Sequence, residues 1–338
     1  MVAGQTLPRS AEAYFDAQAV EADAAIRAVR RQWSRLAPGA VVASYEALRP
    51  TLLAVVLTAQ ARMVAPVPAY TAGVLRQTGQ AAAVEPLSET TPRALVGWAG
   101  DGRMVEGLVD VAPGKVLDGL KAGLPAALAV KQAGEFLDLA VTTVLWDTAR
   151  HAEALEIAVR PGVDGYVRML NPGIHGACSR CAVLAGRWYR RNTGFERHPR
   201  CRCVHIPASE AVAGDYRLNP NDYFDSLSKA DQDRIFTKAG AEVIRNGADP
   251  IQVVNARRGM HTAQVNERGW IPKGRLAPVE RFGRPAYVTT EGTTTRGRAY
   301  RGRTGRRSSE RLMPESILEL ADDQADLMRL LKLHGYLP

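Results

Sequence analysis

All four cysteines of this 338-residue chain lie in one short stretch, Cys178 to His205. It begins with Cys178-Ser-Arg-Cys181 and ends with His198-Pro-Arg-Cys201-Arg-Cys203-Val-His205. Two of the six histidines also lie there. A CxxC turn followed by a segment rich in His and Cys brings thiolates and imidazoles together, which is the ligand pattern of a tetrahedral zinc site. The chain therefore has to fold so that two short loops meet.

The stretch offers more ligands than a structural zinc ion needs, since such an ion takes four. The candidates are Cys178, Cys181, His198, Cys201, Cys203 and His205. Residues i and i+2 of an extended chain share one face but stand too far apart to chelate easily. We therefore expect Cys201 and Cys203 not to bind together unless the backbone turns sharply, and we favour Cys178, Cys181, His198 and Cys201. Reduced structural thiols and a pair of disulfides remain as alternatives.

The composition is that of a globular protein, with 46% hydrophobic residues. The chain is long enough for two domains, or for one core with appendages. Its first residues lack the basic-then-apolar pattern of a secretory signal. The most apolar run, Thr51–Ala61, is shorter than the roughly 20 residues of a membrane helix. These features predict a soluble protein with no membrane partner, made in a reducing cytoplasm.

The net charge of +9 is concentrated in two segments. Residues 281–311 contain nine arginines and two glutamates, and residues 178–205 contain seven arginines and one glutamate. These segments carry +7 and +6, so the rest of the chain is mildly acidic. Such patches indicate a polyanion or an acidic protein surface as a partner.

Apolar residues recur every three or four positions from Ser10 to Pro38, which predicts an amphipathic helix. The stripe consists of Phe15, Ala19, Ala22, Ile26, Val29, Trp33 and Leu36. A second helix is expected over residues 40–64, with Pro50 as a kink or as its true start. The two should form an antiparallel hairpin, followed by a weaker helix over 69–80 and a connector over 83–93.

The central part alternates between helices and short strands. We expect a helix from Pro125 to Pro161, and strands at Tyr166–Leu170 and Cys203–Pro207 that carry the Cys/His loop. Two further helices are expected, from Ser228 to Arg245 and from Asp249 to about Gly259. A helix-turn-helix that reads DNA is an alternative for this pair.

The C-terminal part begins with Gly- and Arg-rich sequence that is too polar to form a core, so it should be an extended arm. Its arginines have the bidentate geometry that phosphates favour, which makes this arm a candidate for binding DNA or for docking on another protein. The candidate arginines are Arg296, Arg298, Arg301, Arg303, Arg306 and Arg307. A final helix is expected over residues 314–333.

The predicted fold class is therefore α+β and mainly helical: an N-terminal helical hairpin, a mixed core with a small sheet that carries the Cys/His loop, an extended basic C-terminal arm and a terminal helix. The expected boundaries are 1–83 for the helical region, 94–260 for the core with its loop at 178–205, 270–312 for the arm, and 313–338 for the terminal helix.

Three short motifs together resemble the MuF-like minor capsid, or head morphogenesis, family of tailed bacteriophages. They are Cys178-Ser-Arg-Cys181, Leu184-Ala-Gly-Arg187 and His198-Pro-Arg-Cys-Arg-Cys203. Downstream sequence is similar to versions from phages of actinobacteria. The resemblance implies a structural head protein that acts near the portal in head assembly and in DNA packaging or ejection. Its partners would be portal and capsid proteins, and its location the host cytoplasm and then the virion head.

Members of this family are often labelled capsid maturation proteases, which is the alternative function. We do not expect protease activity, because a cysteine protease draws its histidine from a distant part of the chain and this loop holds all candidates together. Neither GxSxG nor HExxH occurs in the sequence. A zinc-dependent DNA-binding regulator is a more remote alternative.

Overall fold

The computed structural model describes residues 7–80, 84–171, 178–194, 201–216, 218–257, 261–265, 284–289 and 311–337. The protein is 64% helical with a small antiparallel sheet, which confirms a mainly helical α+β fold. The described residues form two compact units. The larger contains the helices up to α6 and the sheet β1–β3, and the smaller contains α7 (Ser179–Leu184), α8 to α13 and the sheet β4–β6.

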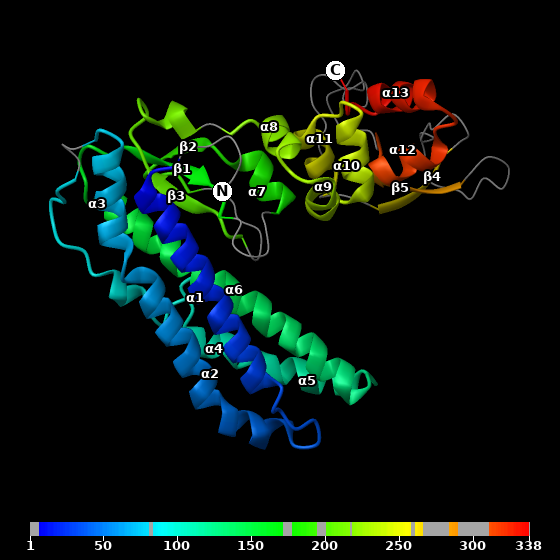
Figure 1. Ribbon diagram of the computed structural model, residues 1–338. Helices are drawn as coiled ribbons and strands as arrows, with labels where there is room; N and C mark the ends of the chain where they lie inside the picture. The colour runs from blue at the N-terminus through cyan, green and yellow to red at the C-terminus, as the bar shows by residue number, and fades with distance from the viewer. Residues whose placement is uncertain are drawn as a thin grey trace, which may run out of the picture. The chain divides into compact units, whose positions relative to one another are not determined.

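The larger unit has three long helices, α1 (Arg9–Trp33), α2 (Val41–Val64) and α6 (Ala126–Ala158), which run side by side (Figure 1). Shorter helices complete it: α3 (Val67–Gln77), α4 (Val105–Val109), α5 (Val111–Lys121) and the 3₁₀ turns η2 (Pro92–Leu95) and η4 (Ala213–Tyr216). Every residue of the predicted α1 stripe is buried, and Pro50 lies inside α2. The α1–α2 pair that the sequence predicts as an antiparallel hairpin is thus joined by α6, which packs beside it and completes the hydrophobic core.

The sheet of the larger unit has the order β2-β1-β3, with β1 (Gly165–Met169) in the centre and both neighbours antiparallel to it. The flanking strands are β2 (Arg187–Arg190) and β3 (Val204–Pro207). The sequence predicts β1 and β3 but not β2. Trp188 of β2 lies over Gly165, where a β-carbon would come within 2.6 Å of the indole ring. Glycine at 165 therefore lets the two strands pair.

The smaller unit consists of short helices around a second three-stranded sheet. Its helices are α8 (Pro220–Asp225), α9 (Lys229–Phe236), α10 (Lys238–Arg245), α11 (Pro250–Ala256), α12 (Pro314–Leu320) and α13 (Gln324–Leu333). Its strands are β4 (His261–Val265), β5 (Arg284–Thr289) and β6 (Arg311–Leu312), in the order β4-β5-β6.

Two helices that the sequence predicts as continuous are each broken in the structure. The helix expected from Ser228 to Arg245 is interrupted at Thr237, whose φ of 70° lies outside the helical region. The helix expected over residues 314–333 stops at Leu320 and restarts after Asp323, whose side chain caps α13. In both cases the side chain at the break, the hydroxyl of Thr237 or the carboxylate of Asp323, caps the helix that follows.

The arginines of the basic arm, from Arg296 to Arg307, lie outside the described residues. On either side of it, Thr289 of β5 and Arg311 of β6 are paired in one antiparallel ladder. The N-terminal helices share one hydrophobic core with α6 and the sheet.

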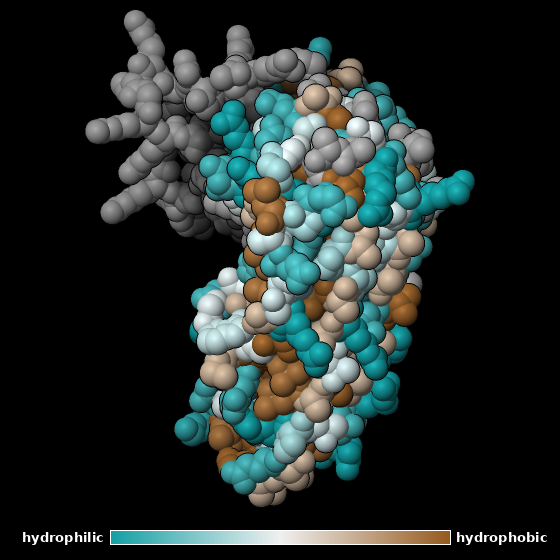
Figure 2. All heavy atoms as spheres, turned by 90° about the vertical axis from the view of Figure 1, so that its left-hand side faces the viewer, coloured by the Kyte–Doolittle hydropathy of each residue, from teal (hydrophilic) through white to brown (hydrophobic). Residues whose placement is uncertain are grey.

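One helical run in the described residues, Val41–Gln77, is long and apolar enough to cross a membrane, with a mean hydropathy of 1.5. By length and composition the core helix of a soluble protein passes the same test, and Leu52, Val56 and Met63 of this run are fully buried in the core. Figure 2 shows patches of hydrophobic residues among hydrophilic ones on one face of the protein. The run is weak evidence for a membrane span.

Candidate metal centre

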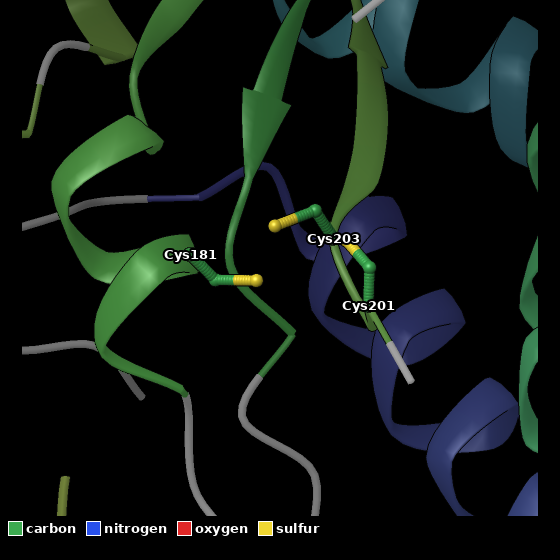
Figure 3. A group of neighbouring side chains, drawn as sticks. All are labelled: Cys181, Cys201 and Cys203. Atoms are coloured by element: carbon green, nitrogen blue, oxygen red, sulfur yellow. The ribbon is translucent and has the colours of Figure 1, made fainter. Parts of the chain in front are cut away.

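Three of the four cysteines come together in a buried cluster. The thiol groups of Cys181, Cys201 and Cys203 all lie within 4.8 Å of one another, and each residue is no more than 4% exposed. Cys181 lies on the short helix α7 (Ser179–Leu184), and the other two immediately precede β3. The three side chains point toward a common space (Figure 3). Such a cluster can hold a metal ion.

Cys201 and Cys203 both contribute to this cluster, although their i, i+2 spacing led us to expect only one of them as a ligand. The backbone at residues 201–203 is not part of a strand, since β3 begins at Val204. The distance between alternate residues of a regular strand therefore does not apply here.

The other three candidate ligands have different surroundings. Cys178 is exposed, and its Sγ accepts the backbone N–H of Cys181 at 3.3 Å, so the CxxC segment forms the expected turn. His205 is buried on β3, where its ring lies against that of Tyr166, with centroids 3.9 Å apart and planes tilted by 30°. His198 lies outside the described residues.

Two buried arginines hold the segment that carries Cys201 and Cys203. Arg150 of α6 donates hydrogen bonds to the carbonyl oxygens of both residues, at 2.8 and 2.9 Å, and pairs with Asp147 at 2.5 Å. Arg168 of β1 places its Nη2 3.8 Å from the Sγ of Cys201. The thiols therefore lie beside two guanidinium groups, whose positive charge favours negatively charged ligands.

Behind this segment lies a buried polar network centred on Glu153 of α6. Its carboxylate accepts the hydroxyl of Tyr14 at 2.8 Å and the backbone N–H of His205 at 3.0 Å. The hydroxyl of Tyr70 donates to the carbonyl oxygen of His205 at 2.6 Å, and the rings of Tyr14 and Tyr70 stack at 4.0 Å. Burial, reinforced by the negative charge of Glu153, raises the pKa of both tyrosines well above its usual value. The network fixes the start of β3 to the helical core.

Sequence patterns did not reveal Arg150, Glu153 and Arg168. Arg150 and Glu153 are three residues apart on α6 and point into the core between apolar neighbours. The sequence signal that could have revealed them is the presence of charged residues within an apolar helical stripe. Such residues are almost never fully buried unless they are paired.

The thiol cluster fits a metal that prefers sulfur ligands. Three convergent thiols, with a fourth on the same CxxC turn, form the donor set of zinc or another thiophilic ion, whereas calcium and magnesium take oxygen ligands. The thiols of Cys178, Cys181, Cys201 and Cys203 are not joined in disulfides.

The comparisons with known proteins neither support nor contradict this interpretation. Comparison with protein-family models, with curated proteins and with solved structures finds no match for this chain. Its function has to be argued from the site.

Proposed function

We propose that this chain is a structural minor capsid, or head morphogenesis, protein of a tailed bacteriophage, in which a zinc ion stabilises the Cys/His loop. The observation that carries the proposal is the gathering of Cys181, Cys201 and Cys203, the cysteines of the two motifs that resemble the MuF-like family, in one buried cluster. The proposed partners are portal and capsid proteins, and the proposed location is the host cytoplasm and then the virion head.

In this proposal the zinc is structural. Cys181, Cys201 and Cys203 supply three thiolates, and Cys178, on the same CxxC turn as Cys181, is the favoured candidate for the fourth. Four thiolates around Zn²⁺ leave a net negative charge, which the neighbouring Arg150 and Arg168 offset. Bound zinc would order the short loops that carry the cysteines and so replace the larger core that such loops lack.

The burial of the thiols argues against a maturation protease. Cys201 and Cys203 are each 1% exposed, so a peptide substrate has no access to their sulfur atoms. Buried His205 is not a member of the thiol cluster; its ring lies against that of Tyr166, and its Nδ1 lies 3.5 Å from Glu153.

The proposed role in the head also includes DNA contact through the arginine-rich segment that contains Arg296 to Arg307. Six arginines can neutralise several phosphates without reading sequence, so binding should weaken steeply with salt. If this segment instead docks on an acidic protein surface, replacement of its arginines should leave DNA binding unchanged.

Co-expression of the chain with the portal and major capsid proteins of its phage tests the proposal directly. We expect the chain to co-purify with assembled heads, and to carry about one zinc per chain by elemental analysis after purification without chelator. A chain that remains outside the heads contradicts the phage role. Wild-type protein that contains no zinc contradicts the metal site, whichever assembly result is found.

A further inference from the structure

A cavity of about 580 Å³ opens on the surface of the larger unit, between α2, the start of α3 and the 3₁₀ turn η2. Leu57, Thr58 and Ala61 line it from α2, since residues three and four apart share one face of a helix. Pro92 of η2 and Val96, which follows η2, line it from the connecting segment. This α2–η2 cavity is mainly apolar and lies within the size range of ligand sites in proteins.

Buried Gln60 of α2 fixes the segment after η2 in place. Its side-chain oxygen accepts the backbone N–H of Gly97 at 2.9 Å, and its side-chain nitrogen donates to the carbonyl oxygen of Trp98 at 3.0 Å. The same nitrogen donates to the hydroxyl of Thr148 on α6 at 2.7 Å. The α2–η2 cavity is therefore preformed, so binding there does not carry the entropic cost of ordering a loop.

Two arginines, Arg62 of α2 and Arg93 of η2, also line the α2–η2 cavity. The side chain of Arg62 is 66% exposed, and its Nη1 lies 3.5 Å from the Oε1 of Glu21, beyond the usual length of a direct hydrogen bond. Arg93 is exposed and has no ion pair in the part of the chain that the structure describes. The apolar space therefore has two exposed positive charges beside it, which an anionic partner can contact.

Because much of its lining is exposed, the α2–η2 cavity favours a segment of a protein over a small molecule. Thr58, Arg62, Ala65 and Arg93 all line it and are all exposed. A small-molecule site buries about 70–90% of its ligand, which an open cavity does not. A docked protein segment covers the open side itself, since one apolar side chain fills the hollow and polar contacts around it exclude water. The two arginines select for a segment that carries carboxylates.

We propose that the α2–η2 cavity docks an acidic segment of another protein. One apolar side chain of this segment inserts between α2 and η2, and carboxylates beside it pair with Arg62 and Arg93. The apolar anchor contributes most of the affinity, whereas the charges determine which partners bind and speed their encounter. The site is separate from the zinc ion and from the arginine-rich segment considered above, and it does not depend on the phage role.

An array of short peptides tests the site in the full chain. Each peptide carries one leucine, isoleucine, phenylalanine, tryptophan or methionine among random aspartate, glutamate, serine and alanine residues. The basic arm would also attract acidic peptides, so its candidate arginines, from Arg296 to Arg307, are first replaced with glutamine. In this background a subset of the peptides should bind, and the same peptides with lysine in place of each acidic residue should not.

Two substitutions on α2 show whether these peptides occupy the cavity. Thr58→Trp places a bulky ring in it, whereas Thr51→Trp places the same ring at an exposed position that does not line it. Thr58→Trp should weaken binding of the selected peptides at least about tenfold, because the anchor loses its space, and Thr51→Trp should leave binding unchanged. Ala65→Trp fills the cavity from a second exposed position and should reproduce the loss. Each variant is checked for an unchanged unfolding midpoint.

Replacement of the two arginines tests the contact with carboxylates. R62Q/R93Q should weaken binding about fivefold, since exposed ion pairs are individually weak, and should make it less dependent on salt. R27Q/R31Q removes the same charge from exposed positions on α1 and should bind like the background. Equal affinity of the two double variants would exclude an acidic partner and overturn the proposal.

The docking site itself would be overturned by an array in which no peptide distinguishes Thr58→Trp from Thr51→Trp. Dodecanoate is the probe for the other kind of occupant. If it binds the background and Thr58→Trp removes this binding, while no peptide responds, the cavity belongs to a small amphiphile instead of a protein segment.

Discussion

The carboxylate of Glu153 accepts the backbone N–H of His205 at 3.0 Å and also lies 3.5 Å from the Nδ1 of its ring. Glu153 belongs to the longest helix, and His205 belongs to the strand that follows the two clustered cysteines. This contact joins the helical core to the metal-binding segment, so the stability of one should depend on the other.

Replacement of Glu153 by alanine should lower the free energy of unfolding by about 3 kcal/mol. The change leaves the hydroxyl of Tyr14 and the N–H of His205 without their buried acceptor, at a cost of about 1–3 kcal/mol for each group. Urea denaturation measures the difference. Glu46→Ala removes an exposed glutamate from helix α2 and should change the stability by less than about 0.5 kcal/mol. Equal effects of the two substitutions would contradict a role for the network.

Replacement of Arg150 by lysine should weaken metal binding while most of the fold remains. Lysine keeps the charge but lacks the planar fork with which Arg150 reaches Asp147 and the carbonyl oxygens of Cys201 and Cys203. Loss of a group that orients metal ligands typically costs 10- to 100-fold in affinity, so we expect a loss of at least about tenfold. Competition of Co²⁺ and Zn²⁺ with a chromogenic chelator reports the affinity. Arg27→Lys, an exposed change on α1, is the control and should bind metal normally.

The sequence predicts those parts of the structure in which a local pattern determines the conformation. The periodicity of α1 locates both its length and its buried face, and Pro125 and Pro161 bracket α6. Strand β2 was missed because its two arginines and two aromatic residues show no apolar alternation, and its pairing depends on Gly165 in a different segment.

The candidate site was predictable in its residue types but not in its geometry. The isolated cysteines indicate that thiols gather, yet the convergence of Cys201 and Cys203 depends on a backbone fixed by Arg150, more than 50 residues earlier in the chain. Tertiary hydrogen bonds of this kind leave no periodic signal in the sequence.

Thr237 has a backbone conformation that the sequence does not predict. Its φ of 70° and ψ of 158° lie in a region that essentially only glycine occupies, and such a conformation costs about 1–3 kcal/mol for other residues. Thr237→Gly should therefore be about 1 kcal/mol more stable than Thr237→Ala, because both lose the hydroxyl but only glycine relieves the backbone. At Thr143, inside helix α6, the order should reverse, since glycine destabilises a helix interior relative to alanine. Thermal and urea unfolding of the four variants give both differences. The same order at both positions would show that Thr237 is unstrained.

Asp110 should make a contribution to stability that disappears in acid. Arg49 hydrogen bonds to both oxygens of Asp110 at 2.8 Å, which lowers the pKa of this carboxyl below its usual value of about 3.9. Because the pKa is lower in the folded protein, the stabilisation is fully present above pH 4 and is lost as the pH falls through the folded-state value. Asp110→Asn should be less stable than the wild type at pH 7, with the difference closing as the pH falls through the folded-state pKa of Asp110.

Urea titrations at several pH values measure this difference. Asp118→Asn, an exposed substitution on helix α5, serves as the control and should show little dependence on pH. A constant gap between Asp110→Asn and the wild type down to pH 2 would mean that the ion pair is not its source.

The last prediction separates Cys178 from His205 as the fourth ligand of the proposed zinc site. The Sγ of Cys178 lies 3.3 Å from the backbone nitrogen of Cys181, on the turn that positions the Cys181 thiol, whereas the His205 ring is held by Tyr166 and Glu153. Cys178→Ser should therefore lose most of its zinc, and His205→Gln should keep about one zinc per chain while its unfolding midpoint falls. Zinc is measured by elemental analysis after dialysis against a weak chelator, with Cys201→Ser as the variant that loses the metal outright. Full zinc content in Cys178→Ser together with its loss in His205→Gln would assign the fourth position to the histidine, and would require the contact between the Tyr166 and His205 rings to open when metal binds.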